Sequence, residues 1–164
     1  MQVGVTSLLP IPPAPSGLFH GPLHLFAVRI YFEDTDLSGV VYHANYLRYM
    51  ERARSDMLRL AGIDQRRANE AGEGAWAVTD LSIKYRLPAR LDDELLVESR
   101  MIAVRGASVQ IGQIIRRRDD ILTEGLVTAA FVSPEGRARR QPAGWAERFR
   151  AIMNGNDPHM DTPA

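Results

Sequence analysis

One short stretch of the chain brings together several side chains that can do chemistry. It runs from Glu33 to Arg54 and reads EDTDLSGVVYHANYLRYMERAR. Within it Asp34, Asp36 and His43 stand close to the start of a segment with helical periodicity. Carboxylates and an imidazole at this spacing suit three kinds of site: a calcium-binding loop, a transition-metal site, or an acid–base centre that needs no metal.

The first half of the stretch resembles an EF-hand calcium loop, but the second half does not. Asp34, Asp36 and Ser38 alternate, and Gly39 stands where such a loop turns. The twelfth position should be a glutamate that binds calcium through both oxygens, and here it is Asn45. The preceding run LFAVRIYF also favours a strand where an EF-hand has a helix. The sequence therefore disfavours calcium.

A transition-metal site would use Asp34, Asp36 and His43 as its ligands. The remaining histidines lie far away in the sequence, at positions 20, 24 and 159. One histidine and two loop carboxylates form a weak ligand set, so no metal is expected here.

A carboxylate just before a helix is the third kind of site. The free N–H groups and the dipole of a helix N-terminus favour negative charge, so they can polarise a carbonyl while Asp36 attacks it or activates water. Taken alone, the residues favour a purely structural interpretation instead. Asp and Ser are common in turns that contain glycine, and Asn45 is a suitable helix N-cap.

The surrounding sequence predicts the elements that position this stretch. Leu25 to Phe32 favours a buried strand, and apolar residues at steps of three and four from Tyr46 to Ala61 predict an amphipathic helix that ends at Gly62. After residue 74 the chain is strand-like: residues 81–87 alternate as in a half-buried strand. Three further strand-like runs (94–104, 107–117 and 121–132) follow, and residues 141–153 favour a short helix.

This order of elements predicts an α+β fold of one domain. A helix with one apolar face needs a sheet to cover that face, so we expect it to lie on a curved antiparallel sheet with meander connections. Residues 25–153 form the expected domain. The proline-rich residues 1–24 predict a flexible N-terminal extension, and residues 154–164 a disordered tail.

Composition narrows the functional classes. The 164 residues carry 20 basic and 20 acidic side chains, which disfavours a dedicated nucleic-acid binder. The absence of cysteine excludes thiolate zinc sites and cysteine nucleophiles. No apolar run approaches the roughly 18 residues of a membrane span, and the proline-broken N-terminus lacks the pattern of a signal peptide. We therefore expect a cytoplasmic protein, with peripheral membrane association left open.

Two blocks of sequence resemble a known family. The block EDTDLSGVVYHANYLRYMERARSDML closely resembles the signature of hot-dog-fold acyl-CoA thioesterases of the 4-hydroxybenzoyl-CoA thioesterase type, and most of all their bacterial Tol–Pal-associated subfamily. The block LSIKYRLPARLDDELLVES resembles the family's next strand, turn and strand. The resemblance extends over residues 28–133. It implies a long helix wrapped by an antiparallel sheet, active sites shared within a homodimer or homotetramer, and no cofactor.

The resemblance also implies roles for particular residues. The family's catalytic aspartate matches Asp36, whereas Asp34 is expected to shape the loop. The helix N-terminus whose backbone N–H polarises the thioester carbonyl matches His43. Contacts to coenzyme A match Arg105 and Ser108, although the family is often more basic there. The arginines at positions 137, 139 and 140 are alternative phosphate contacts, and Glu51 is an alternative catalytic base.

The resemblance thus implies hydrolysis of an acyl-CoA thioester to a free acid and coenzyme A, with a tilt toward short-chain or small aromatic acyl groups. Asp36 is expected to act as nucleophile or general base, and the sequence does not decide between the two. Two other classes stay open. One is a non-catalytic scaffold module of the cell-envelope Tol–Pal system, and the other is a CoA-dependent dehydratase on the same fold.

Overall fold

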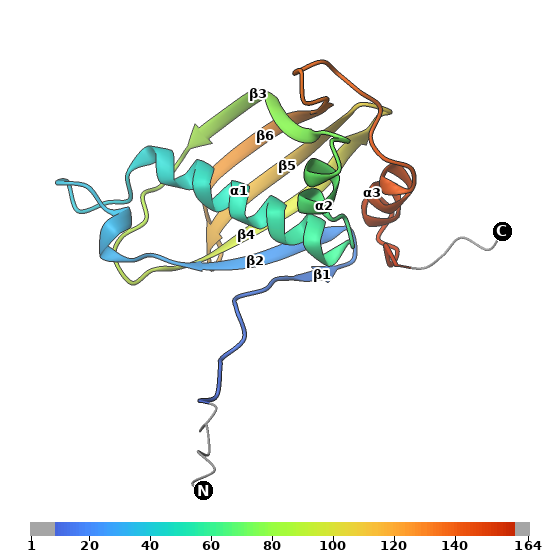
Figure 1. Cartoon of the computed structure of the whole chain (residues 1–164). Coiled ribbons are helices and arrows are strands. Elements are labelled where there is room, and N and C mark those ends of the chain that lie inside the picture. Colours follow the sequence, from blue (N-terminus) through green and yellow to red (C-terminus); the bar gives the residue numbers. More distant parts are fainter. Residues whose placement is uncertain (1–8, 160–164) are drawn as a thin grey trace, which may run out of the picture.

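An antiparallel sheet of six strands with one long helix across its face forms the body of the protein (Figure 1). The computed structural model describes residues 9–159. Along the chain the elements are β1 (Leu18–His20), β2 (Leu23–Arg29), a 3-10 turn (Phe32–Asp34), α1 (His43–Leu60), α2 (Gln65–Glu70), β3 (Ala75–Tyr85), β4 (Glu94–Val104), β5 (Ser108–Arg117), β6 (Asp120–Val132) and α3 (Trp145–Met153). The predicted α+β class is confirmed.

The strands are arranged in the order β1-β2-β4-β5-β6-β3, and every neighbouring pair is antiparallel. The predicted meander is therefore present in β4, β5 and β6. β3 precedes them in sequence but pairs with β6, so it forms one edge of the sheet. Figure 1 shows α1 running along one face, with α2 and α3 near the end of the sheet where α1 finishes.

The predicted apolar stripe of α1 faces the sheet. Met50, Ala53 and Met57 have no exposed surface, as the three-and-four spacing predicts. Gly125 on β6 allows a close approach, because a Cβ at this position would lie 3.0 Å from the sulfur and terminal methyl of Met50. Helix α1 is thus seated firmly on the centre of the sheet.

The predicted end of α1 is also confirmed. Gly62 has a φ of 71°, a left-handed conformation that glycine adopts at little cost. The N–H of Gly62 bonds to the carbonyl of Arg59, and that of Ile63 bonds to the carbonyl of Leu58 at 2.9 Å. This pair of bonds is the Schellman arrangement, which satisfies carbonyls that a helix end otherwise leaves free.

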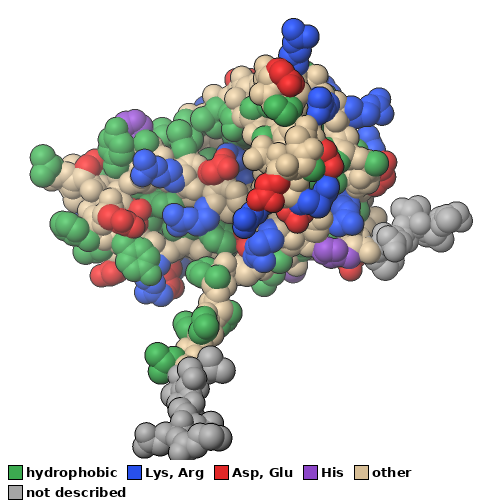
Figure 2. Space-filling view, in the orientation of Figure 1, with side chains coloured by type: hydrophobic (Ala, Val, Ile, Leu, Met, Phe, Trp, Pro, Cys, Tyr) green, Lys and Arg blue, Asp and Glu red, His purple; other side chains and the backbone are tan. Residues whose placement is uncertain are grey.

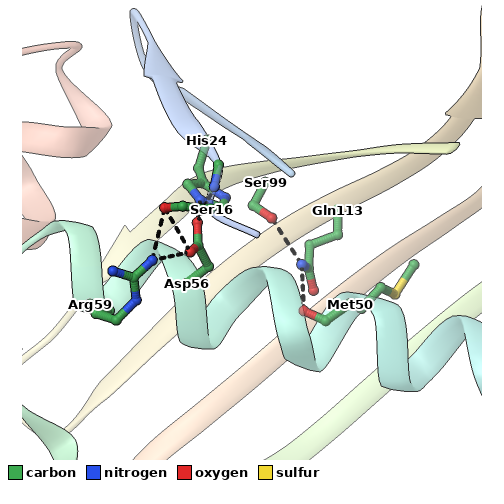
Figure 3. Close-up of polar contacts among 8 residues, drawn as sticks. Ser16, His24, Met50, Asp56, Arg59, Ser99 and Gln113 are labelled. Carbon is green, nitrogen blue, oxygen red and sulfur yellow. Dashed lines mark hydrogen bonds and ion pairs between the residues drawn. The ribbon is translucent and has the colours of Figure 1, made fainter. Parts of the chain in front are cut away.

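The predicted boundary of the flexible N-terminal extension, after residue 24, is wrong. β1 and the start of β2 both lie before Leu25, and His24 has no exposed surface. His24 Nε2 lies 2.8 Å from Asp56 Oδ2, and the N–H of Gly17 donates to the same oxygen at 2.8 Å (Figure 3). A buried carboxylate on α1 thus holds this segment, and the prolines upstream gave no sign of it. Residues 1–8 lie outside the described part.

The predicted disordered tail is also partly wrong. Pro158 is buried, and the ring of His159 contacts the carbonyl of Leu60 at the end of α1. Pro158 and His159 therefore pack on the fold, while residues 160–164 lie outside the described part. Arg148 on α3 donates to the carbonyl of Ala61 at 2.8 Å, and its positive charge favours the negative end of the helix dipole.

β3 is more exposed than its alternating pattern predicted. Leu81 and Tyr85 are 38% and 44% exposed, although the strand register places them on the same side of the sheet as α1. The reason is that β3 is an edge strand, where a side chain has a neighbouring strand on one side only.

Helix α2 was not predicted, although Asp64 caps it by accepting a bond from the N–H of Arg67 at 2.9 Å.

Candidate active site

The loop that precedes α1 folds into a tight turn. Thr35 and Val41 form an isolated antiparallel bridge, and the N–H of Asp36 bonds to the carbonyl of Val40 at 3.0 Å. Gly39 closes the turn with a φ of 76°, a conformation that explains why glycine stands there. The turn presents Leu37 and Asp36 at its tip, and both side chains are exposed.

Asp34 anchors this loop to the helix. Its carboxylate accepts a bond from the N–H of Tyr31 at 2.8 Å. Its carbonyl accepts bonds from the N–H of Tyr42 at 2.9 Å and from the side-chain amide of Asn45 at 2.8 Å. The prediction that Asn45 is the N-cap is wrong: the helix begins at His43, its N-cap is Tyr42, and Asn45 instead ties the first turn to the loop.

Asp36 keeps one carboxylate oxygen free. Both the N–H and the hydroxyl of Ser38 donate to Oδ1, the former at 2.8 Å, and Oδ2 has no partner among residues 9–159. These two bonds from Ser38, with a smaller contribution from His43, lower the pKa of Asp36 below its ordinary value. The carboxylate is therefore ionised at neutral pH and has an oxygen available for chemistry.

The N-terminus of α1 has no side-chain cap. Tyr42 makes no capping bond and the first turn contains no acidic residue. In the described chain the N–H groups of His43 and Ala44 have no acceptor. The imidazole of His43 lies edge-on against the rings of Tyr42 and Tyr85, at centroid distances of 4.5 and 6.2 Å. An anionic group approaching this helix end would meet free donors and a favourable dipole.

A hollow of about 500 Å³ lies beside α1 and starts one helical turn beyond His43. Apolar side chains from α1, β3 and β6 form part of its lining, and charged side chains of α1 form the rest: Leu47, Arg48, Glu51, Arg52, Arg54, Val78, Leu81 and Val127. Figure 2 shows basic and acidic side chains gathered along the face that carries α1. The hollow has the size of a small-molecule pocket and is open to solvent.

Glu51, the alternative catalytic base, is engaged in a chain of polar contacts. It forms an ion pair with Arg54, which donates to the buried side chain of Gln113 at 2.7 Å. Gln113 in turn donates to the carbonyl of Met50 and to the hydroxyl of Ser99, as Figure 3 shows. These contacts tie the middle of α1 to the sheet. Glu51 therefore has a structural role, whereas Asp36 keeps a free carboxylate oxygen.

The three residues weighed as metal ligands do not converge. The carboxylate of Asp34 is engaged by the N–H of Tyr31, whereas that of Asp36 is engaged by Ser38. Across residues 9–159, no group of three histidine, cysteine or acidic side chains comes close enough to hold a metal ion.

Arg105 and Ser108 lie at the opposite end of the sheet from Asp36 and His43. Tyr85, which touches His43, pairs with Thr123, and Thr123 pairs with Ile115 on β5. Ser108 is seven residues away from Ile115 along the same strand, or about 23 Å at the usual rise per residue. One chain therefore does not bring the two predicted parts of the site together.

The loop that follows β6 holds the arginines predicted as alternative phosphate contacts. Arg139 donates to the carbonyls of Gly72 and Glu73, at 3.2 and 2.7 Å, and so braces a turn. Arg140 lies close to Gly106, where an added Cβ would be 3.8 Å from its guanidinium. The position of Arg140 beside the β4–β5 turn keeps a phosphate-binding role open to it.

A long helix on an antiparallel sheet, with an ionised aspartate in the loop before an uncapped helix N-terminus, has the features of an acyl-transfer hydrolase. Comparison with known proteins agrees. Residues 38–124 match the thioesterase superfamily. The acyl-CoA thioesterase YbgC of Haemophilus influenzae is 42% identical over 129 residues, covering 79% of this chain and 93% of that protein.

Two further relatives point to the same family. The acyl-CoA thioester hydrolase YbgC of Escherichia coli O157:H7 is 40% identical over 113 residues, which cover 68% of this chain and 84% of that protein. The crystal structure of a probable thioesterase from Bartonella henselae superposes with a TM-score of 0.70 at 36% identity, covering 73% of this chain and 99% of that one. The chain belongs to the thioesterase superfamily, with the hot-dog fold, and is an acyl-CoA thioester hydrolase.

Within the described residues, no helix is both long and apolar enough to cross a membrane.

Proposed function

We propose that Asp36 and the N-terminus of α1 together carry out the hydrolysis. The observation that carries this proposal is an ionised carboxylate with a free oxygen, in the turn that leads into a helix whose first N–H groups are unpaired, and near enough to His43 for that residue to lower the pKa of Asp36. The N–H at His43 binds the thioester carbonyl oxygen and stabilises the negative charge that develops on it. The helix dipole adds to that stabilisation because it is positive at this end.

Two balanced routes use the same residues. As a general base, Asp36 removes a proton from water, the hydroxide adds to the carbonyl carbon, and the C–S bond breaks to release coenzyme A as its thiolate. As a nucleophile, Asp36 adds to the carbonyl carbon itself, and the C–S bond breaks to release coenzyme A as its thiolate. Water then hydrolyses the resulting anhydride to the free acid and the regenerated carboxylate of Asp36. A single turnover in oxygen-18 water separates them, because only the nucleophilic route leaves label in the carboxylate of Asp36.

The basic activity is tested by incubating purified protein with a panel of acyl-CoA thioesters and measuring the release of free thiol. We expect turnover with short-chain or small aromatic acyl groups, because the hollow beside α1 is compact and partly apolar. Release of thiol from none of the panel would refute an acyl-CoA hydrolase on this chain. Turnover limited to long chains would retain the reaction and refute the proposed substrate preference.

We further propose that a second copy of the chain completes the site. The edge strand β3 leaves backbone donors and acceptors unpaired on its outer side and exposes Val78 at 52% and Leu81 at 38%. If β3 pairs antiparallel with the β3 of a second copy, the two-fold axis reverses the direction of the sheet. The end that carries Arg105 and Ser108 in one copy then lies at the end that carries Asp36 in the other, where the two residues can bind coenzyme A.

This arrangement requires a dimer or a dimer of dimers. Light scattering on the purified protein is expected to give at least twice the 18.3 kDa mass of the chain. Changing Arg105 to Ala is expected to raise KM for acyl-CoA by about tenfold, as loss of a charged contact does. A monomer with full turnover would rule out the shared site.

A further inference from the structure

The last residue of β3, Tyr85, reaches the first residue of α1. Its hydroxyl donates a hydrogen bond to the backbone carbonyl of His43 at 2.9 Å. Its ring stands edge-on to the ring of His43, at a centroid distance of 6.2 Å, and to that of Tyr46 at 5.6 Å. This contact was not predicted from the sequence, because it joins residues 42 positions apart.

The carbonyl of His43 belongs to the same peptide unit as the N–H of Ala44. The two groups are held in one rigid plane and point in opposite directions. A donor on the carbonyl oxygen draws electron density along the unit, which strengthens the N–H as a hydrogen-bond donor. That N–H has no acceptor within residues 9–159, so it is available to a ligand at the helix end.

We propose that Tyr85 is a positioning residue for the reaction: it fixes and polarises the His43–Ala44 peptide so that the N–H of Ala44 joins that of His43 in binding the thioester oxygen. The inference rests on the proposed function of the α1 N-terminus. Partial burial raises the pKa of the Tyr85 hydroxyl above its ordinary value, so the group keeps its proton. The end of the edge strand β3 thereby orients the first peptide unit of α1 without contacting the substrate.

The test is Tyr85→Phe, which removes the hydroxyl and keeps the ring. Because Tyr85 is 44% exposed and its ring contacts survive, the variant should fold. We expect kcat to fall about tenfold, as for one lost hydrogen bond, while KM changes less than twofold, because charge on the oxygen is greatest in the transition state. Incorporation of 3-fluorotyrosine at position 85 retains the hydroxyl and should keep kcat within twofold of the wild type.

The matched control is Tyr31→Phe. Tyr31 is 60% exposed and its hydroxyl makes no hydrogen bond in the described chain, so its loss should leave kcat unchanged. If Tyr85→Phe has wild-type kcat, or if KM alone rises, the positioning role is wrong. A tenfold loss that the fluorinated residue does not restore would overturn it too. Failure of the proposed function is distinct, because the wild type itself would then release no thiol from any acyl-CoA.

Discussion

The change from Asp36 to Asn tests the centre of the proposed mechanism. Asn keeps the shape of the side chain and an oxygen that can accept both bonds from Ser38. The side chain of Asp36 is exposed to solvent, so little packing depends on it. We expect the melting temperature and the free energy of unfolding to stay close to those of the wild type, as is usual for an exposed position.

The rate should respond very differently from the stability. The substitution removes the negative charge, and with it either the nucleophile or the general base. General acid–base groups contribute about 100- to 10,000-fold in rate, so kcat should fall by about the same factor. Loss of a covalent nucleophile would cost at least as much. Free-thiol release in the steady state measures kcat, and circular dichroism during heating measures folding.

Two matched variants show whether the effect is specific. Asp34→Asn should cost less than about tenfold in kcat, because its amide oxygen can still accept the bond from Tyr31 while its backbone carbonyl still anchors the helix. Glu51→Gln disrupts the ion pair with Arg54 and is expected to act mainly on stability. If Asp36→Asn hydrolyses acyl-CoA within a few-fold of the wild type, the assignment is wrong and Glu51 becomes the candidate.

Two further predictions concern the N-terminal segment. A protein that begins at Pro13 should melt like the full chain. One that begins at Leu25 loses β1 and the contacts of Ser16, Gly17 and His24 with Asp56, so it should be less stable by at least about 2 kcal/mol. Equal melting of both would show that the segment contributes nothing. Burial lowers the pKa of His24 below its ordinary 6.5. The unfolded chain therefore takes up the proton first, so the unfolding free energy should fall as the pH drops through 6.5, and this decline should be weaker in His24→Gln in pH-dependent melting.

Segments with strong local patterns were predictable from the sequence. The apolar stripe from Tyr46 to Ala61 predicted which face of α1 is buried, and Gly62 predicted where the helix ends. Both signals are local, because they lie within the helix or directly after it. β4, β5 and β6 followed from continuous apolar or alternating runs. β1 did not, because three residues in a proline-rich segment carry no periodicity. Its place in the sheet depends on Asp56, which lies on another element.

The same difference between local sequence signals and contacts between distant elements applies to the candidate site. Asp36 and His43 lie seven positions apart, so the family signature could place both of them. The distance from Ser108 to that signature could not be read from the sequence, because it depends on the strand register of β5 and β6. The bond from Tyr85 to His43 depends equally on the register, since it places the end of an edge strand against the start of the helix.

Three aspartates in or near α1 differ in how many hydrogen bonds their carboxylates make, and this difference separates structural carboxylates from one that is available for a reaction. Asp56 has both oxygens occupied, by Gly17, His24 and Arg59 among others, and lies almost buried. Asp34 also uses its carboxylate within the chain, on the N–H of Tyr31. Asp36 bonds only within its own turn and through one oxygen, which leaves the other free beside an uncapped helix end. Of these three carboxylates, Asp36 is the one that can meet a substrate without first breaking contacts that hold the fold.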